Sequence, residues 1–407
     1  MFSTRWIQCL CWAMLVLVIA ITPFAVQKMP ATNEGYVQSF HNDWAGVIRI
    51  WLHDTWKPGN GSFIPWLNAC AARFEKRFPG VYIQITPIST AAFGDLLSAS
   101  SNPPDAVLFA PQSLSSGIGL TEQEAHPSLC SSLTDAGRYQ DRLCAQPVAM
   151  GGYVWVINRA LLDSVPIDWS ALADLPPPQS GKKQPRHLMQ VPADQPFTNW
   201  SAALNALCAP RVVTPESKQS HAASYEIDLG LPTAPTPSID TTPAESEIIL
   251  CRLPQSLPDD FRQSSSALST FLTGNTAAIP ATQYEIRQLQ LRSDQGRAPD
   301  WIAEPGNAAF SDQLLMMGIV DHPRNDSTQR QQLAEKFMAS LLDEDAQIAL
   351  SGIRALRVTY GASLYRNQAG MDVLEQVFSE SFTIPNAFDN TWRKRSAAEA
   401  DRLTRET

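Results

Sequence analysis

Hydrophobic and polar positions along the chain follow two periods in turn, and this predicts strands and helices that alternate. The stretch 46–52 (GVIRIWL) is typical of a strand, and 62–78 places large apolar residues on one helical stripe. The segments 81–86, 93–101 and 103–110 then predict a strand, a short helix and a nearly all-apolar strand. Such alternation indicates an α/β fold in which helices cover a parallel sheet.

The same pattern resumes further along the chain. A strand is expected within 150–162 (MGGYVWVINRALL), and 266–290 predicts helix, turn, strand and helix. A long amphipathic helix follows near 328–342, with a second, short helix over 343–352. Between these parts, 230–246 (GLPTAPTPSIDTTPAES) has no apolar period and many prolines, which predicts a surface insertion over about 210–250.

One of these strands carries an ambiguous pattern. Because side chains alternate along a strand, Tyr153 and Trp155 share one face, and Val154 and Val156 share the other. Aromatic residues with polar tips fit a buried core, and they equally fit a flat apolar surface for a ligand. The pattern leaves both interpretations open.

The N-terminus carries a candidate export signal. Arg5 and the free amine precede about 20 mostly apolar residues, enough for a helix that crosses a bilayer. Positive charge ahead of that run favours an N-terminus inside and a body outside the membrane. The end of the run, Pro23-Phe24-Ala25-Val26-Gln27, is a poor small-x-small cleavage site. We therefore interpret 1–27 as an uncleaved anchor in preference to a signal peptide, with a polar spacer over 28–44.

Charge and cysteine usage narrow the function further. The net charge of −9 and the pI of about 5.2 argue against a nucleic-acid partner, which would need clustered cations. Seven cysteines are compatible with export. Cys130 with Cys144, and Cys208 with Cys251, are candidate disulfide pairs, although the sequence does not fix the connectivity.

Five segments, taken in order, carry a resemblance to a known family. They are IRIWLHDTW…FIPWLNACAARFEKRFPGVYIQIT, PPDAVLF, QPVAMGGYVWVINRALL, FLTGNTAAIPATQ and FSDQLLMMGIV…QLAEKFMASLLDEDAQIAL, which together span most of 46–358. This series resembles the extracellular solute-binding protein family 1, the maltose-binding-protein-like receptors of ABC importers. The proline-rich region between 200 and 262 and the Ala-Ala-Ile after the F-x-x-G element depart from the family pattern, and the lipobox of Gram-positive relatives is missing.

The resemblance implies a periplasmic-binding-protein-like (type II) fold. It has two lobes, each a mostly parallel sheet flanked by helices, joined by two or three crossovers. The expected division is 45–149 plus 264–318 for lobe 1 and 150–263 plus 319–407 for lobe 2. The implied function is to bind a small polar solute, preferably a sugar or oligosaccharide, and to deliver it to a membrane permease. A monomer outside the cytoplasm, without enzyme activity or cofactor, is expected.

Candidate ligand-binding residues follow from this arrangement. In open α/β sheets the crevice for a ligand lies outside the carboxyl ends of the strands. A neutral sugar combines apolar C–H faces with a rim of hydroxyl groups, so its site needs aromatic rings and planar hydrogen-bonding groups. The candidates are Trp51, His53, Asp54, Trp56, Gln112, Tyr153, Trp155, Phe197, Trp200, Tyr284, Trp301 and Trp392. The choice of Phe197, Trp200, Tyr284 and Trp392 rests on the resemblance.

Several candidates also have a purely structural interpretation. Trp51 shares a strand face with Val47 and Arg49, and a helix covering that face would make Trp51 a core residue. His53 and Asp54 follow the strand, where solvent exposure explains a polar residue as well as binding does. The pattern does not decide between these roles.

The main alternative function is an exported hydrolase that acts on a carbohydrate. The sequence has no G-x-S-x-G elbow, no H-E-x-x-H motif and no glycine-rich nucleotide loop, and its six histidines are scattered. No catalytic residue and no metal ligand are therefore assigned. A glycosidase pair of carboxylates leaves no such signature, so turnover of chromogenic glycosides would separate the two functions.

Overall fold

The computed structural model describes residues 44–89, 92–111, 113–162, 187–192, 261–264, 266–305, 311–321, 327–380, 384 and 386–388. The expected anchor (1–27), nearly all of the spacer and the proline-rich insertion lie outside these residues. Across the described ranges, no helix combines the length and the apolar character needed to cross a membrane.

The elements that build the two sheets and their cover follow the expected alternation. They are β1 (Gly46–His53), α2 (Ile64–Arg77), β2 (Val81–Pro87), α3 (Phe93–Ala99), β3 (Ala106–Phe109), β6 (Gln146–Met150), β7 (Val154–Asn158), β8 (His187–Pro192), β9 (Phe261–Ser264), α6 (Ala267–Leu272), β10 (Thr276–Ala281), α7 (Gln283–Asp294), β11 (Trp301–Glu304), β12 (Leu314–Ile319), α8 (Ser327–Leu342), α9 (Glu344–Ala349), η4 (Leu350–Ile353) and α10 (Met371–Glu380). The short elements α4 (Ser131–Thr134), η1 (Asp135–Gly137), β4 (Arg138–Tyr139) and β5 (Arg142–Leu143) lie between β3 and β6.

The first sheet has the strand order β2-β1-β3-β12-β6. Strand β1 pairs in parallel with β2 and β3, whereas β12 runs antiparallel to both β3 and β6. Every residue of β3, β6 and β12 is buried, as expected for strands covered on both faces. The sheet is therefore parallel apart from β12.

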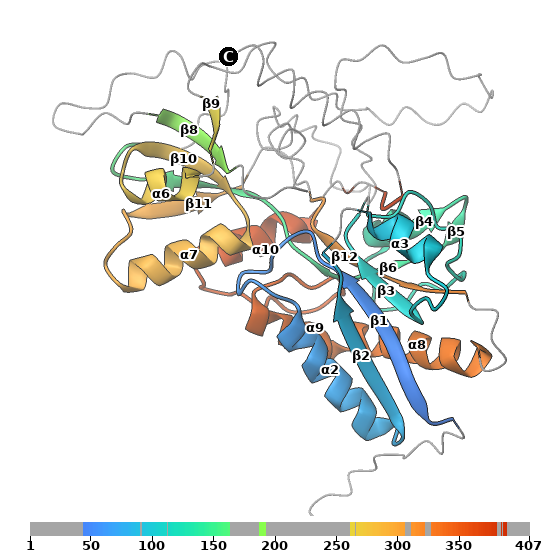
Figure 1. The fold of residues 1–407 in the computed structure, drawn as a ribbon. Coiled ribbons are helices and arrows are strands. Elements are labelled where there is room, and N and C mark those ends of the chain that lie inside the picture. The colour runs from blue at the N-terminus through green and yellow to red at the C-terminus, as the bar shows by residue number, and fades with distance from the viewer. Residues whose placement is uncertain are drawn as a thin grey trace, which may run out of the picture.

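The second sheet has the order β11-β7-β10-β8-β9. Strand β10 pairs in parallel with β8, and β8 with β9, whereas β7 runs antiparallel to β10 and β11. Each sheet thus contains one antiparallel strand. In both sheets this strand is the first one that the chain forms after it has crossed from the other sheet. Strand β7 follows β6 of the first sheet, and β12 follows β11 of the second (Figure 1).

The strand pairing changes the expected division of the chain. Residues 264–304 were assigned to the lobe of the first sheet, but β10 and β11 pair with β7 in the second. Helix α8 was assigned to the second lobe, yet its Phe337 packs edge-on against Phe74 of α2, with ring centroids 5.3 Å apart. The reason is that long-range pairing and packing decide lobe membership, and the local period of a segment does not encode them.

Local sequence explains why α2 begins and ends where it does. The Ser62 hydroxyl accepts a hydrogen bond from the Ile64 amide at 3.2 Å, and a proline occupies the first turn. Lys76 and Arg77 lie in the last turn, where cations favour the helix dipole, and Gly80 turns the chain away with φ of 88°.

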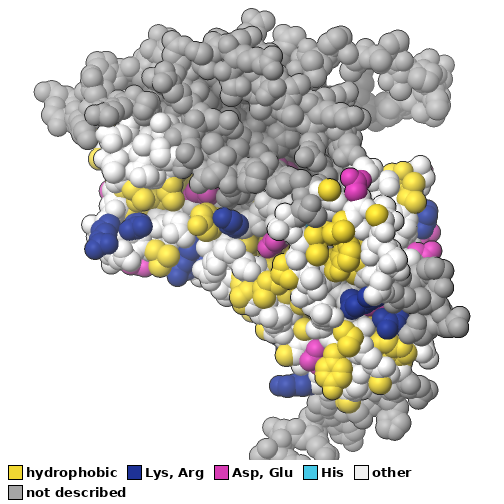
Figure 2. Space-filling view, viewed as in Figure 1, with side chains coloured by type: hydrophobic (Ala, Val, Ile, Leu, Met, Phe, Trp, Pro, Cys, Tyr) yellow, Lys and Arg dark blue, Asp and Glu magenta, His cyan; other side chains and the backbone are white. Residues whose placement is uncertain are grey.

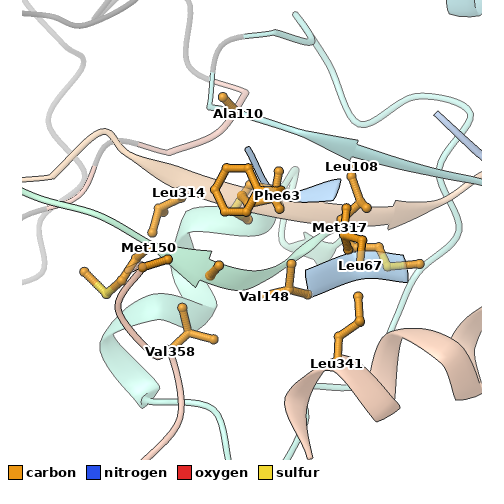
Figure 3. Close-up of a cluster of buried hydrophobic side chains, with 14 of the residues drawn as sticks. Phe63, Leu67, Leu108, Ala110, Val148, Met150, Leu314, Met317, Leu341 and Val358 are labelled. Carbon is orange, nitrogen blue, oxygen red and sulfur yellow. The ribbon is translucent and has the colours of Figure 1, made fainter. Parts of the chain in front are cut away.

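The core beneath the first sheet draws on segments from both ends of the chain. Side chains of α2, β3, β6, β12 and α8 converge there, as the labels Leu67, Leu108, Val148, Met317 and Leu341 show in Figure 3. Each is fully or almost fully buried, which stabilises the fold by about 1.5–3 kcal/mol per side chain.

The cysteine prediction is wrong for the pair that the structure describes. Cys130 and Cys144 are both free thiols. The Cys130 amide is bonded to the Val358 carbonyl, while the Cys144 amide is bonded to the Gly137 carbonyl, so different parts of the chain hold them. Cys208 and Cys251 lie outside the described residues.

Candidate functional site

Three stretches of chain pass between the two sheets. Gly151 and Gly152 lie between β6 and β7. The chain returns from β11 to β12 between Glu304 and Leu314, where residues 305 and 311–313 are described. The segment 354–370 runs from the first lobe to α10. Figure 1 draws α10 between the two groups of strands. Two or three such crossovers are what the sequence led us to expect.

Buried amide side chains hold these crossovers together. The Gln283 side chain accepts a hydrogen bond from the Gly152 amide at 3.2 Å, and it donates to the Lys57 carbonyl and to Gln313 Oε1, both at 2.8 Å. Gln283 and Gln313 are at most 1% exposed. A single side chain at the start of α7 therefore connects the β1 loop, the first crossover and the segment before β12.

The two glycines at the first crossover lie in close contact with neighbouring side chains. A Cβ atom on Gly151 would lie 2.5 Å from the Oε1 atoms of both Gln283 and Gln313. A Cβ atom on Gly152 would overlap the ring of Phe378 on α10. A side chain at either position would force these neighbouring side chains to shift, which explains the Gly-Gly pair.

Tyr153 lies directly after this pair, and its phenol is tied to the second crossover. The Tyr153 hydroxyl donates a hydrogen bond of 2.6 Å to Asp312 Oδ1. Beside it, the Ser311 hydroxyl donates to the Gly151 carbonyl at 2.7 Å. Asp312 was not among the sequence candidates, although the polar run Ser311-Asp312-Gln313 directly before an all-apolar strand is a detectable signal.

The carboxyl end of β1 holds two candidates against α3. The His53 ring stacks on Phe93 with centroids 4.6 Å apart, and Trp51 is tilted against the same ring at 6.5 Å. His53 is buried, and Trp51 is half-buried. The helix covering the mixed face of β1 is therefore present at this end, and only Trp51 of this pair keeps an accessible surface.

Lys57 interacts with both Asp54 and Tyr284. The Lys57 Nζ atom lies 5.4 Å from the centroid of the Tyr284 ring, and Lys57 also interacts electrostatically with Asp54. Asp54 is exposed as a residue, but partial burial of its carboxyl raises the pKa, against the opposing effects of its backbone hydrogen bond and of Lys57. The interactions of Lys57 connect the loop after β1 to the start of α7, the helix that follows β10 of the second sheet.

Two aromatic candidates besides Tyr153 are buried. Trp56 packs edge-on against Phe63, and its Nε1 donates to the Leu314 carbonyl at 2.9 Å. Trp155 is 0% exposed, on the face of β7 opposite to Val154 and Val156, which join the continuous core. Burial favours a packing role for both tryptophans.

The remaining candidates are apart from this region or not described. Trp301 lies on the edge strand β11, where its Nε1 donates to Ser293 Oγ at 2.8 Å. Gln112, Phe197, Trp200 and Trp392 lie outside the described residues. The structure thus brings Trp51 and His53 against the same Phe93 ring, and Tyr153 against Asp312, while Asp54 and Tyr284 each interact with Lys57.

The described residues contain no cluster of three or more His, Cys, Asp or Glu side chains that could hold a metal ion. The chemistry that this region offers is hydrogen bonding by carboxylates and amides beside aromatic rings. Such groups suit the recognition of a polar, uncharged ligand.

Comparison with known proteins shows the fold and leaves the family open. No family model matches the chain, and no curated protein matches its sequence. Among solved structures, the chain is similar to the GacH receptor of Streptomyces glaucescens GLA.O, solved without ligand and in complex with acarbose and an acarbose homolog. The TM-score is 0.58 at 13% identity, over 90% of this chain and 95% of that chain. The protein therefore has the mixed α/β fold of a two-lobed sugar-binding receptor.

Proposed function

We propose that this protein is an extracytoplasmic solute-binding protein of an ABC importer. It binds a sugar or oligosaccharide between its two lobes and delivers it to a membrane permease. The observation that carries this proposal is the two-lobed fold, shared over nearly the whole chain with a receptor solved in complex with acarbose. In this proposal residues 1–27 tether a monomeric body to the outer face of the membrane.

The ligand is placed where the two lobes face each other at the crossovers. Trp51 and Asp54 would contribute an aromatic face and a carboxylate from the first lobe, and Tyr284 an aromatic ring from the second. A sugar fits this combination because its C–H faces pack on rings while its hydroxyl groups donate to carboxylates. Tyr153 and Asp312 would complete the floor, since both lie on crossovers.

Binding between lobes implies a change in their relative position. A ligand that contacts both lobes favours the closed arrangement over the open one, and it shifts the population accordingly. The crossovers absorb this movement. The buried hydrogen bonds of the Gln283 side chain hold the crossovers in place while the lobes move, because they link both lobes to one side chain.

The experiment that tests this function is a binding screen paired with a turnover assay. The purified protein is screened by thermal shift against neutral mono- and oligosaccharides, including maltose, maltotriose and acarbose, and each hit is titrated calorimetrically. The same preparation is incubated with chromogenic glycosides. Saturable binding without turnover supports a binding protein. Turnover supports the alternative hydrolase, and a folded protein that binds no sugar contradicts the ligand class.

The substitutions Asp54→Asn and Trp51→Ala test where the proposed sugar site lies. Both substitutions should weaken binding of a sugar that the unmodified protein binds, by about tenfold for each lost charged hydrogen bond or ring contact. Gln84→Asn is a matched control, because Gln84 is exposed on the outer strand β2. Equal affinity in all three variants would remove these residues from the site.

A further inference from the structure

The guanidinium group of Arg287 has no partner in the described part of the molecule. Arg287 lies on α7, one turn after Gln283, and it is half-buried. Its Nε atom is buried and makes no hydrogen bond with any described residue. A buried donor without an acceptor costs about 1–3 kcal/mol, and more when the group is charged, so an unpaired arginine here needs an explanation.

A second arginine is held against the start of the same helix. Arg354 follows η4 in the left-handed conformation, with φ of 56°, and its carbonyl accepts a 3.0 Å hydrogen bond from the Gly59 amide. A Cβ atom built on Gly59 would meet both Arg354 Cβ at 2.6 Å and the Gln283 carbonyl at 3.0 Å. The backbones of Arg354 and Gln283 therefore flank Gly59 closely, which places Arg354 beside the helix that carries Arg287.

The Arg354 side chain has one neutral partner. Its Nη1 donates to Gln368 Oε1 at 2.9 Å, and no carboxylate within the described ranges forms an ion pair with either arginine. Burial lowers the pKa of Arg354, and the charge of Arg287 lowers it further. Tyr365 and Asp294 act in the opposite direction with smaller effect. The positive charges of Arg287 and Arg354 thus repel each other in a partly buried environment.

The two arginines come from different lobes. Helix α7 follows β10 of the second sheet. Arg354 belongs to the first lobe, because the Leu356 amide and carbonyl both bond to Met150 of β6, at 2.7 and 3.1 Å. Basic side chains gather over the part of the molecule where α7 lies (Figure 2).

We propose that Arg287 and Arg354 form a binding site for a small oxyanion of the phosphate type, which bridges the two lobes on the α7 side. The planar fork of an arginine matches the paired oxygens of phosphate, and two arginines together offer several donors to one anion. The anion neutralises the two like charges and gives the buried Nε of Arg287 an acceptor. The proposed sugar site uses other side chains, and its Tyr284 lies one turn before Arg287 on the same helix.

A rearrangement without a ligand is the competing explanation. The Gln290 Oε1 atom, three residues further on α7, is also buried without a partner. A turn of the Arg287 side chain towards it would satisfy both groups. In that case phosphate would not bind, so the same titration separates the two explanations.

The test is a titration of the purified protein with inorganic phosphate in the absence of sugar, followed by calorimetry and thermal unfolding. Potassium chloride at equal ionic strength controls for screening. The unmodified protein should show saturable binding and a rise in Tm that chloride does not reproduce. Arg287→Gln and Arg354→Gln should each weaken phosphate binding by about tenfold or more, as expected for a lost charge-assisted hydrogen bond. Arg287→Lys should retain part of the affinity, because it keeps the charge and loses the fork.

The matched control is Arg292→Gln, which removes an exposed arginine from the last turn of the same helix. This variant should bind phosphate like the unmodified protein. Phosphate that acts no more strongly than chloride, or Gln variants that bind it unchanged, would overturn the proposal. If Arg354→Gln fails to fold, Arg287→Gln decides the question, since the buried Nε of Arg287 makes no hydrogen bond with a described residue that the substitution would remove.

A second arm tests the link between the lobes, and it rests on the proposed function. Phosphate should change the affinity for a bound sugar in the unmodified protein and leave the affinity of Arg287→Gln unchanged, because coupling requires both lobes to share the anion. Phosphate binding without any such change would overturn the bridging role. A failure to find a sugar affects only this arm, since phosphate binding is measured alone.

Discussion

The Tyr153 hydroxyl donates a hydrogen bond of 2.6 Å to Asp312 Oδ1, and this bond joins the first crossover between the lobes to the second. Tyr153 is 2% exposed, so its phenol needs such a partner. The pair lies beside the Gly-Gly segment and the buried Gln283 network. The Tyr153–Asp312 hydrogen bond therefore connects the two crossovers through residues that we propose for ligand binding.

Tyr153→Phe should weaken sugar binding by about tenfold and lower the free energy of unfolding by about 1.5–3 kcal/mol, because it removes a hydrogen bond to a charged acceptor. Asp312→Asn should have a smaller effect, since an amide oxygen still accepts the bond. Urea unfolding and calorimetric titration measure the two quantities. A Tyr153→Phe variant unchanged in both would show that the bond contributes to neither.

Gly152→Ala should destabilise the protein by about 1–3 kcal/mol, because the new methyl group overlaps the Phe378 ring and forces α10 to move. Adding Phe378→Ala should recover part of that loss, so the two effects should not be additive. Gly94→Ala is the control. Its methyl group would make only ordinary contacts at 3.6 and 3.7 Å. Equal effects of Gly152→Ala and Gly94→Ala in thermal unfolding would contradict the close approach.

Gln283→Leu should lower the free energy of unfolding by about 2–4 kcal/mol, since it leaves the Gly152 amide, the Lys57 carbonyl and the Gln313 amide oxygen without their partner. Gln288→Leu on the same helix serves as the control and should change little, because Gln288 is only half-buried. The prediction fails if chemical denaturation shows the same stability for both variants.

The stability of the folded protein should depend on pH through the carboxyl group of Asp54, and Asp54→Asn should remove this dependence. Burial raises the pKa of this carboxyl in the folded state above its unfolded value, so the folded protein binds the proton more tightly. Stability should therefore fall as pH rises from about 3.8, the usual value, through the raised pKa. The difference in Tm between Asp54→Asn and the unmodified protein should become more positive across that window. A constant difference from pH 3 to pH 7 would show that the carboxyl is not desolvated.

The sequence predicted the local elements well because their signals are local. Leu333, Phe337 and Leu341 recur at helical spacing and lie buried on α8, and the apolar run before Pro111 forms β3. The sequence did not predict that β10 pairs with β7. That pairing depends on an antiparallel register between segments far apart in the chain, which no local period encodes.

The site was predicted only in part, for a related reason. The aromatic and polar residues after β1 were identified, but the pattern could not show that Trp56 faces the core and donates to Leu314. Asp312 and Gln313 were missed because a polar residue in a loop is common, and Gln283 because a polar residue in the first turn of a helix is equally common. Their importance comes from meeting Gly151, Gly152 and Tyr153 in space.

The most direct test of the account measures the distance between the lobes with and without ligand. Spin labels are attached at Gln84 on β2 and at Gln295 after α7, both exposed and on different lobes. The distance distribution is recorded by pulsed electron resonance, first alone and then with a sugar that the calorimetric screen has identified. We predict that saturating sugar shifts the distribution to a new, narrower distance, because the ligand favours one arrangement of the lobes. An unchanged distribution at full occupancy would contradict binding between two lobes that close.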